Sequence, residues 1–283
     1  MKTLYITDLD GTLLRPDATL SEKSVEILNR LMRQGANFTV ATARSFSTTI
    51  QILKPLNLVL PIAMMNGVTI YDLASKKYLD IKNMHHSSAL AVDICLKANG
   101  VSAFMFTIEN NILHTYYDVL TPQMTKYKEY RSKFFGKKFS QVEALSNLCD
   151  ENVVYFSTLG KKEYLEKVIP GLKQIDGIKF EFYRDVYSDT VWFEELWYLE
   201  IFDSTASKKS AVEFMRSHFG FDKVVCFGDN LNDIPMFEAS DIGCAVQNAR
   251  EELKAIATEV IGANSEEGVA SWLEANFVQS ACT

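Results

Sequence analysis

The chain has 283 residues, of which 47% are hydrophobic and 23% charged, with 13 glycines and 6 prolines. This composition is typical of a folded globular protein and excludes disordered, fibrous and collagen-like chains. At roughly 100–200 residues per domain, the length favours two domains. The formal net charge of −7 argues against a general nucleic-acid binder, which needs a broad basic face.

Membrane and secretion signals are not evident. The most apolar stretch, residues 56–65, is interrupted by Pro61 and is far shorter than the roughly 20 residues of a membrane-spanning helix. Residues 1–7 run directly into a strand-like pattern, where a signal peptide would carry a long apolar segment. Five dispersed cysteines without CxxC spacing are typical of a reducing compartment. We therefore expect a cytoplasmic protein with no membrane partner.

The first part of the chain alternates strand and helix patterns. Val25, Leu28, Leu31 and Met32 recur at the three- and four-residue steps of an amphipathic helix, and Gly35 can end it. The expected elements are strand 3–7, helix 20–35, strand 38–41, helix 47–57 and strand 58–64. This order predicts an α/β fold with a doubly wound, Rossmann-like parallel sheet, whose sites lie at the carboxyl ends of its strands.

The rhythm changes after residues 66–67 and returns late in the chain. Residues 68–71 and 77–81 resemble a hairpin, and residues 83–188 show an α+β pattern of aromatic-rich strands and two helical runs. The α/β pattern resumes with a helix at 207–218, a strand at 223–227, a helix from about 232 and a strand at 242–246. We therefore predict a core domain from residues 1–82 and 189–283, with an inserted α+β domain at 83–188 and hinges near 82–84 and 187–190.

One basic run within the insert has two interpretations. Residues 126–138 mix lysines with aromatic residues, which is compatible with a nucleic-acid patch. A solvated face of an amphipathic helix fits the acidic net charge better. We expect no nucleic-acid partner.

The densest candidate site follows the first strand. In Asp8-Leu9-Asp10-Gly11-Thr12, the two carboxylates are two residues apart on an extended segment, so both project to one side. Two acids at the edge of a sheet repel each other unless a cation is close, and Mg²⁺ prefers such all-oxygen ligands. A calcium loop is excluded because its later acidic positions are missing. A simple acidic turn stays possible at this point.

A second polar cluster follows the strand predicted at 223–227. Gly228-Asp229-Asn230-Leu231-Asn232-Asp233 again places carboxylates and amides at a strand end. Asp229 or Asn230 could instead only cap the following helix. Two acidic clusters at equivalent strand ends, far apart in the sequence, favour a shared functional site.

Two further segments can bind an anion. Thr42-Ala43-Arg44 ends the second strand with a hydroxyl, free N–H groups and a guanidinium. Lys208 opens a predicted helix, where a cation is unfavourable against the positive end of the helix dipole unless it neutralises an anion. An exposed pair of Lys208 and Lys209 is the alternative.

Together these motifs resemble the haloacid dehalogenase superfamily, specifically the Cof-like phosphatases with a large α/β cap. The four motifs occur in the order of the family, and Asn66-Gly67 and the segment 266–270 match as well. Ala43 and Lys209 stand where the family usually has glycine. The resemblance implies a Rossmann-like core and a cap that closes over the active site and selects the substrate among sugar phosphates, nucleotides and cofactor phosphates.

The resemblance also implies a role for each matching residue. Asp8 is the expected nucleophile, and Asp10 the general acid and base. Mg²⁺ is the expected cofactor, held by Asp8, the backbone carbonyl of Asp10 and Asp229, with Asp233 supporting these ligands. The expected phosphate-binding residues are Leu9, Thr42, Ala43, Lys208 and Asn232, and Arg44 is a candidate substrate-binding residue.

The function implied is a Mg²⁺-dependent phosphatase that hydrolyses small phosphorylated metabolites through an aspartyl-phosphate. A phosphotransferase or phosphomutase on the same scaffold is one alternative, and a non-catalytic phosphosugar sensor is another. The presence of both Asp8 and Asp10 counts against the sensor, since binding alone needs no acid–base carboxylate. The expected partner is a small-molecule phosphate ester, and the oligomeric state stays open.

Overall fold

The computed structural model describes residues 1–149, 152–185 and 195–277 of the chain. The chain divides into two compact units. The first comprises Met1–Ser45, Thr49–Asp80 and Ala206–Thr283, and the second Phe46–Thr48 and Ile81–Thr205.

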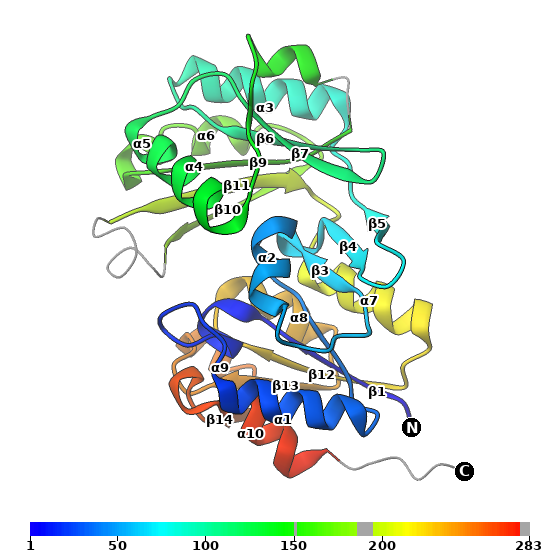
Figure 1. Cartoon of the computed structure of the whole chain (residues 1–283). Coiled ribbons are helices and arrows are strands. Elements are labelled where there is room, and N and C mark those ends of the chain that lie inside the picture. The colour runs from blue at the N-terminus through cyan, green and yellow to red at the C-terminus, as the bar shows by residue number, and fades with distance from the viewer. Residues whose placement is uncertain (150–151, 186–194, 278–283) are drawn as a thin grey trace. The chain divides into compact units, whose positions relative to one another are not determined.

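A five-stranded parallel sheet forms the centre of the first unit (Figure 1). Its spatial order is β14-β13-β12-β1-β2. The strands are β1 (Thr3–Thr7), β2 (Asn37–Val40), β12 (Lys223–Gly228), β13 (Ile242–Val246) and β14 (Glu259–Ile261). Leu4, Tyr5 and Ile6 are consecutive and all buried, because helices cover both faces of the sheet.

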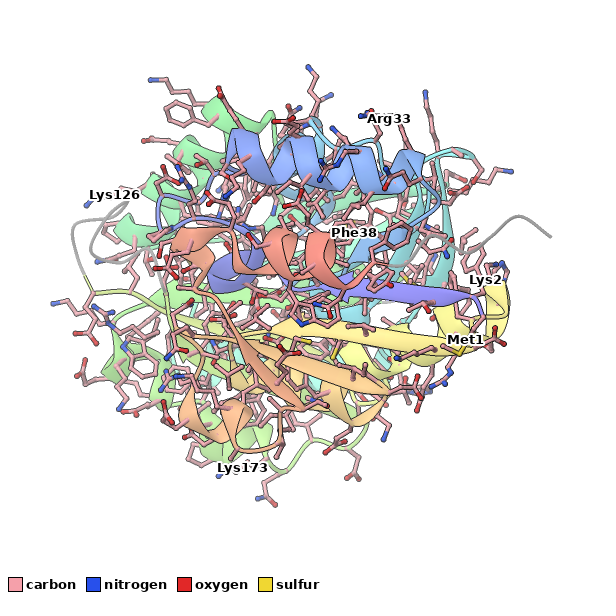
Figure 2. The ribbon with its side chains drawn as sticks, turned by 90° about the horizontal axis from the view of Figure 1, so that it is seen from below. Met1, Lys2, Arg33, Phe38, Lys126 and Lys173 are labelled. Atoms are coloured by element: carbon pink, nitrogen blue, oxygen red, sulfur yellow. The ribbon has the colours of Figure 1, made fainter. Side chains whose placement is uncertain are left out.

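Helices cover this sheet on its two faces, with α1 and α10 on one side and α7 and α8 on the other (Figure 1). The helices of the first unit are α1 (Glu22–Arg33), α7 (Lys208–Phe219), α8 (Ile234–Glu238), α9 (Glu251–Lys254) and α10 (Gly268–Asn276), and α2 (Phe46–Leu53) is divided between the two units. Figure 2 shows α1, which ends at the labelled Arg33, beside α10, and Arg30 of α1 pairs with Glu274 of α10. Ser21 caps α1 by accepting a hydrogen bond from the Ser24 N–H at 3.0 Å.

The third predicted strand differs from expectation. β3 (Ile62–Met64) leaves the parallel sheet and joins a three-stranded sheet with β4 (Thr69–Asp72) and β5 (Lys77–Ile81), pairing antiparallel with β4. A single bridge between Ala41 and Ala63 is its link to the end of β2. The strand also starts later than the predicted residue 58, since Pro61 has no N–H to donate to a ladder.

A six-stranded sheet forms the second unit, in the order β10-β11-β9-β6-β7-β8. Its strands are β6 (Phe104–Glu109), β7 (Ile112–Tyr117), β8 (Ser140–Gln141), β9 (Val153–Gly160), β10 (Ile178–Arg184) and β11 (Trp197–Asp203). Its helices are α3 (His86–Ala98), α4 (Pro122–Phe135), α5 (Lys162–Glu166) and α6 (Ile169–Leu172). Met105, Phe156 and Leu199 from three strands pack with Val92 and Leu96 of α3 in its apolar core.

The second unit ends later than residue 188, the predicted boundary. β11 pairs antiparallel with both β9 and β10, so Trp197–Asp203 belongs to the six-stranded sheet, and the unit extends to Thr205. The sequence pattern predicted no element for these residues. The hinge predicted at 187–190 lies outside the described residues, and the first boundary falls between Asp80 and Ile81.

The basic run at 126–138 covers most of α4. Lys126 and Lys133 are exposed, in agreement with a solvated helix face. Lys137 differs, because it is buried with its ammonium 4.4 Å from the centre of the Phe106 ring and 5.2 Å from that of Phe139. Burial lowers the pKa of Lys137 to about 7.

Two sequence-based expectations concern membranes and disulfides. No described helix combines the length and the apolar character that crossing a membrane requires. The four cysteines within the described ranges, Cys95, Cys149, Cys226 and Cys244, are free thiols. Cys282 lies outside these ranges.

Candidate active site

The two acidic clusters meet because their strands are neighbours. β1 and β12 are parallel, with Thr7 paired to Phe227 at their carboxyl ends. The Asp8 N–H continues this ladder by donating to the Phe227 carbonyl at 2.9 Å. Asp8 and Asp229 therefore both leave the same edge of the sheet.

A buried lysine joins these carboxylates. Lys208 Nζ donates to Asp8 Oδ1 and to Asp233 Oδ1, each at 2.6 Å, and its side chain is 0% exposed. Lys209 is partly exposed and lies 3.8 Å from Glu238. Of the two lysines that open α7, Lys208 enters the acidic cluster, and this explains a cation at the N-terminus of the helix.

Asp233 is held by protein donors at both oxygens. Oδ1 accepts from Lys208, while Oδ2 accepts from the N–H groups of Asp229 at 2.9 Å and Asn230 at 3.0 Å. The carboxylate therefore fixes the loop after β12. This arrangement suits a residue that supports metal ligands.

The cluster fits a hard divalent cation. One carboxylate oxygen each from Asp8, Asp229 and Asp233 lie within 4.8 Å of one another. With Lys208 the four buried side chains carry formal charges of −3 and +1, a net charge of −2. Thr12 Oγ1 donates to Asp229 Oδ1 at 2.9 Å, and within the described ranges the other oxygens of Asp8 and Asp229 accept no hydrogen bond. Mg²⁺, which prefers oxygen ligands, matches this donor set.

The electrostatics of the site point the same way. Burial raises the pKa of Asp8 to about 7, with repulsion from Asp233 and Asp10 adding to the effect and Lys208 opposing it. Burial, and then the charges of Asp8 and Asp233, raise the pKa of Asp229 well above its ordinary value. A divalent cation offsets this repulsion and favours the ionised carboxylates.

Asp10 points elsewhere. Its carboxylate accepts two hydrogen bonds from Arg44, at 2.7 Å from Nε and 2.6 Å from one terminal nitrogen. Asp10 is thus absent from the group of three acids that could hold a metal. Substrate binding by Arg44 stays a prediction, and in the structure its guanidinium lies on Asp10.

The other predicted phosphate-binding residues lie on adjoining loops. The Thr42 hydroxyl accepts the Arg44 N–H at 3.1 Å, and the Thr42 carbonyl accepts the Asn66 N–H at 3.0 Å. Asn232 Nδ2 donates to Asn66 Oδ1 at 3.2 Å. Asn66 therefore links the loops after β2 and β12. Ala43 is partly exposed on the first of these loops, whereas Leu9 is buried beside Asp8.

Asn248 supports the site, although the sequence motifs did not predict a role for it. Its Nδ2 donates to the Gly11 carbonyl at 2.7 Å, and its Oδ1 accepts the Asn264 N–H at 3.0 Å. Two residues later, the Arg250 N–H donates to the Asp229 carbonyl at 2.8 Å. The available signal was position, because Asn248 follows β13, and parallel strands end at one edge of a sheet.

Gly11 is predicted to be essential for metal binding. Its φ is +79°, and a Cβ there would lie 2.3 Å from Asp229 Oδ2. Gly11→Ala is therefore expected to displace the Asp229 carboxylate and to weaken Mg²⁺ binding about 10- to 100-fold, as loss of a ligand-orienting contact does. Titration calorimetry with Mg²⁺ measures this. Gly220→Ala is the matched control, since Gly220 has a φ of +64° but no atom within 4 Å of its Cβ position. Equal Mg²⁺ affinity in Gly11→Ala and Gly220→Ala would contradict this role.

The first unit presents clustered carboxylates and a buried lysine at the edge of a Rossmann-like parallel sheet. These features define a class of α/β enzymes with an acidic site that fits a metal ion. Comparison with known families identifies the family within this class. The model of the haloacid dehalogenase-like hydrolases matches residues 5–273, and the chain belongs to this family. The resemblance identified from the sequence motifs is thus confirmed.

Similar proteins cover nearly the whole chain. Pyridoxal phosphate phosphatase YbhA of Escherichia coli is 26% identical over 277 residues, which cover 96% of this chain and 97% of that protein. The 5-amino-6-(5-phospho-D-ribitylamino)uracil phosphatase YitU of Bacillus subtilis is 24% identical over 282 residues, covering 97% of each. The crystal structure of TM0651 from Thermotoga maritima has a TM-score of 0.79 at 23% identity and covers 100% of this chain and 99% of its own, which confirms the fold.

Proposed function

We propose that this hydrolase is a Mg²⁺-dependent phosphatase that acts on small phosphorylated metabolites, sugar phosphates or similar monoesters, through an aspartyl-phosphate at Asp8. The observation that carries the proposal is the convergence of Asp8, Asp229 and Asp233 around Lys208 at one sheet edge. The names of the similar phosphatases support a phosphate monoester as substrate.

The metal would be held by Asp8, Asp229 and the backbone carbonyl of Asp10, with Asp233 supporting these ligands. When bound, Mg²⁺ supplies charge that offsets the repulsion between the Asp8 carboxylate and an anionic phosphate. The unpaired oxygens of Asp8 and Asp229 are the groups that suit this role.

In the first step, an Asp8 carboxylate oxygen attacks phosphorus, and the bond from phosphorus to the ester oxygen breaks. Asp10 donates its proton to this leaving oxygen. Lys208 offsets negative charge on the transferring group. The remaining donors to the phosphoryl oxygens, in this proposal, are the Thr42 hydroxyl, the Asn232 amide and the N–H groups of Leu9 and Ala43.

In the second step, Asp10 takes a proton from water as the water oxygen attacks phosphorus. The bond from phosphorus to the Asp8 oxygen breaks, inorganic phosphate leaves, and the Asp8 carboxylate is restored. Dividing one displacement into two through an enzyme nucleophile is covalent catalysis.

The proposal also covers substrate choice and location. We assign the choice of substrate to the second unit, and the free cysteines favour a cytoplasmic location.

Phosphate release tests the proposal. The purified chain is incubated with p-nitrophenyl phosphate and with a panel of sugar and cofactor phosphates, with Mg²⁺ or with EDTA. We expect release of inorganic phosphate that EDTA abolishes and added Mg²⁺ restores. Transfer of the phosphoryl group to an acceptor without free phosphate would instead favour a phosphotransferase or phosphomutase. Tight binding without turnover would favour a sensor.

Asp10→Ala is expected to lower kcat for a sugar phosphate by about 10² to 10⁴, the usual contribution of general acid–base catalysis. Steady-state phosphate release measures the loss. Asp17→Ala is the control, because Asp17 is an exposed residue of the loop before α1. An unchanged kcat in Asp10→Ala would exclude Asp10 from proton transfer.

A further inference from the structure

We propose that Arg44 is a positioning residue for Asp10, rather than a ligand of the substrate phosphate. Its guanidinium fixes both the position and the plane of the Asp10 carboxylate, which transfers the proton. This inference rests on the proposed function and adds a role that the sequence motifs do not assign.

The first support is the geometry of the pair. Arg44 donates from Nε to Asp10 Oδ2 at 2.7 Å and from a terminal nitrogen to Oδ1 at 2.6 Å, so each carboxylate oxygen has its own donor. Two parallel N–H···O bonds from a planar guanidinium set the orientation of a carboxylate as well as its distance. The side chains are 9% and 24% exposed, so water competes little for either partner.

The second support is the anchoring of Arg44 itself. Its N–H donates to Thr42 Oγ1 at 3.1 Å, and its carbonyl accepts the Met65 N–H at 3.2 Å. Hydrogen bonds therefore hold both the backbone N–H and the backbone carbonyl from which the Arg44 side chain extends. Arg44 and Asp10 follow the adjacent strands β2 and β1, so both lie at the same edge of the five-stranded sheet.

The third support is the position of the Asp10 carboxylate when it is paired with Arg44. Asp8 lies in the acidic group that fits a metal, whereas the Asp10 carboxylate, two residues later, does not. A free carboxylate beside a divalent cation tends to coordinate it. The pair with Arg44 holds Asp10 as a carboxylate that accepts at both oxygens, and this is the form that takes a proton from water in the second step.

The test is a double-mutant cycle between Arg44→Met and Asp10→Ala. In single-turnover release of p-nitrophenol, Arg44→Met is expected to slow the wild type but to change the Asp10→Ala variant by less than about twofold, because the two side chains act as one unit. With an alkyl phosphate, whose poor leaving group needs the proton more, Arg44→Met should lower kcat by about 10- to 100-fold. The inhibition constant of inorganic phosphate should stay within about twofold.

Two further variants sharpen the result. Arg44→Lys keeps the charge but cannot hold both oxygens in one plane, so it should restore only part of kcat. It also carries the test if Arg44→Met does not fold. Arg15→Met is the matched control, since Arg15 pairs with Glu267 in the same unit and is 45% exposed at its side chain. Thermal unfolding monitors the fold of each variant.

Three outcomes would overturn the inference: an equal loss from Arg44→Met with and without Asp10, weakened inhibition by inorganic phosphate, or full activity of Arg44→Met on the alkyl phosphate. The first two would make Arg44 a phosphate ligand. Absence of any phosphatase activity in the wild type is a separate result, which would contradict the proposed function.

Discussion

Asp8→Asn is expected to abolish turnover, to below about a thousandth of the wild-type rate, as removal of a covalent nucleophile does. The amide has the size of the carboxylate, but its oxygen is a poor nucleophile toward phosphorus. Mass spectrometry after incubation with substrate should show the phosphorylated chain in the wild type and not in the variant.

The same substitution should leave the fold stable. Because the pKa of Asp8 is raised from 3.8 to about 7, the unfolded chain loses this proton at lower pH than the folded one. The ionised Asp8 therefore costs the metal-free fold stability as the pH rises from about 4 to about 7. A neutral amide removes this cost, so the midpoint of thermal unfolding without metal at pH 8 should equal or exceed that of the wild type. Turnover above a few thousandths of the wild-type rate would exclude Asp8 as the nucleophile.

Lys208→Met is expected to destabilise the metal-free chain by about 3–5 kcal/mol, the usual result of removing one partner of a buried ion pair. Lys208 contacts both Asp8 and Asp233, and among the described residues no other basic side chain pairs with the three carboxylates. The loss of stability should be smaller at pH 5 than at pH 8, because Asp8, with a pKa of about 7, is protonated at pH 5. Phosphatase activity should fall as well, since the transferring phosphoryl group loses its lysine.

Urea unfolding at the two pH values measures this effect, and Lys209→Met is the control. Lys209 lies in the same first turn of α7 but is partly exposed, 3.8 Å from Glu238, so its loss should change the free energy of unfolding by no more than about 0.5 kcal/mol. Equal effects of the two substitutions would show that the buried contacts of Lys208 do not hold the carboxylates together.

The local sequence was enough to predict the parts of the core that carry the acids. The strands at Thr3–Thr7 and Ile242–Val246 have the predicted bounds, and the strand at Lys223–Gly228 differs by one residue. Their short apolar runs end directly before polar residues, and parallel strands end at a common edge of the sheet. The order of elements therefore predicted that the residues after β1 and β12 lie at one edge of the sheet, whereas the pairing of these two strands brings them side by side. The motifs were sufficient to identify the family.

The tertiary structure decided what depends on partners distant in the chain. Trp197–Asp203 is an apolar strand that could serve either sheet, and only its pairing with β9 and β10 places it in the second unit. In the same way, the choice of Lys208 over Lys209 and the pairing of Arg44 with Asp10 are contacts between loops, which no spacing of residues specifies. The sequence by itself determined which segments form strands and which residues end them, because propensity and periodicity act over a few neighbouring residues. Only the packed chain decided which strand pairs with which and which side chain each carboxylate meets, since those choices rest on burial and hydrogen bonding across the whole fold.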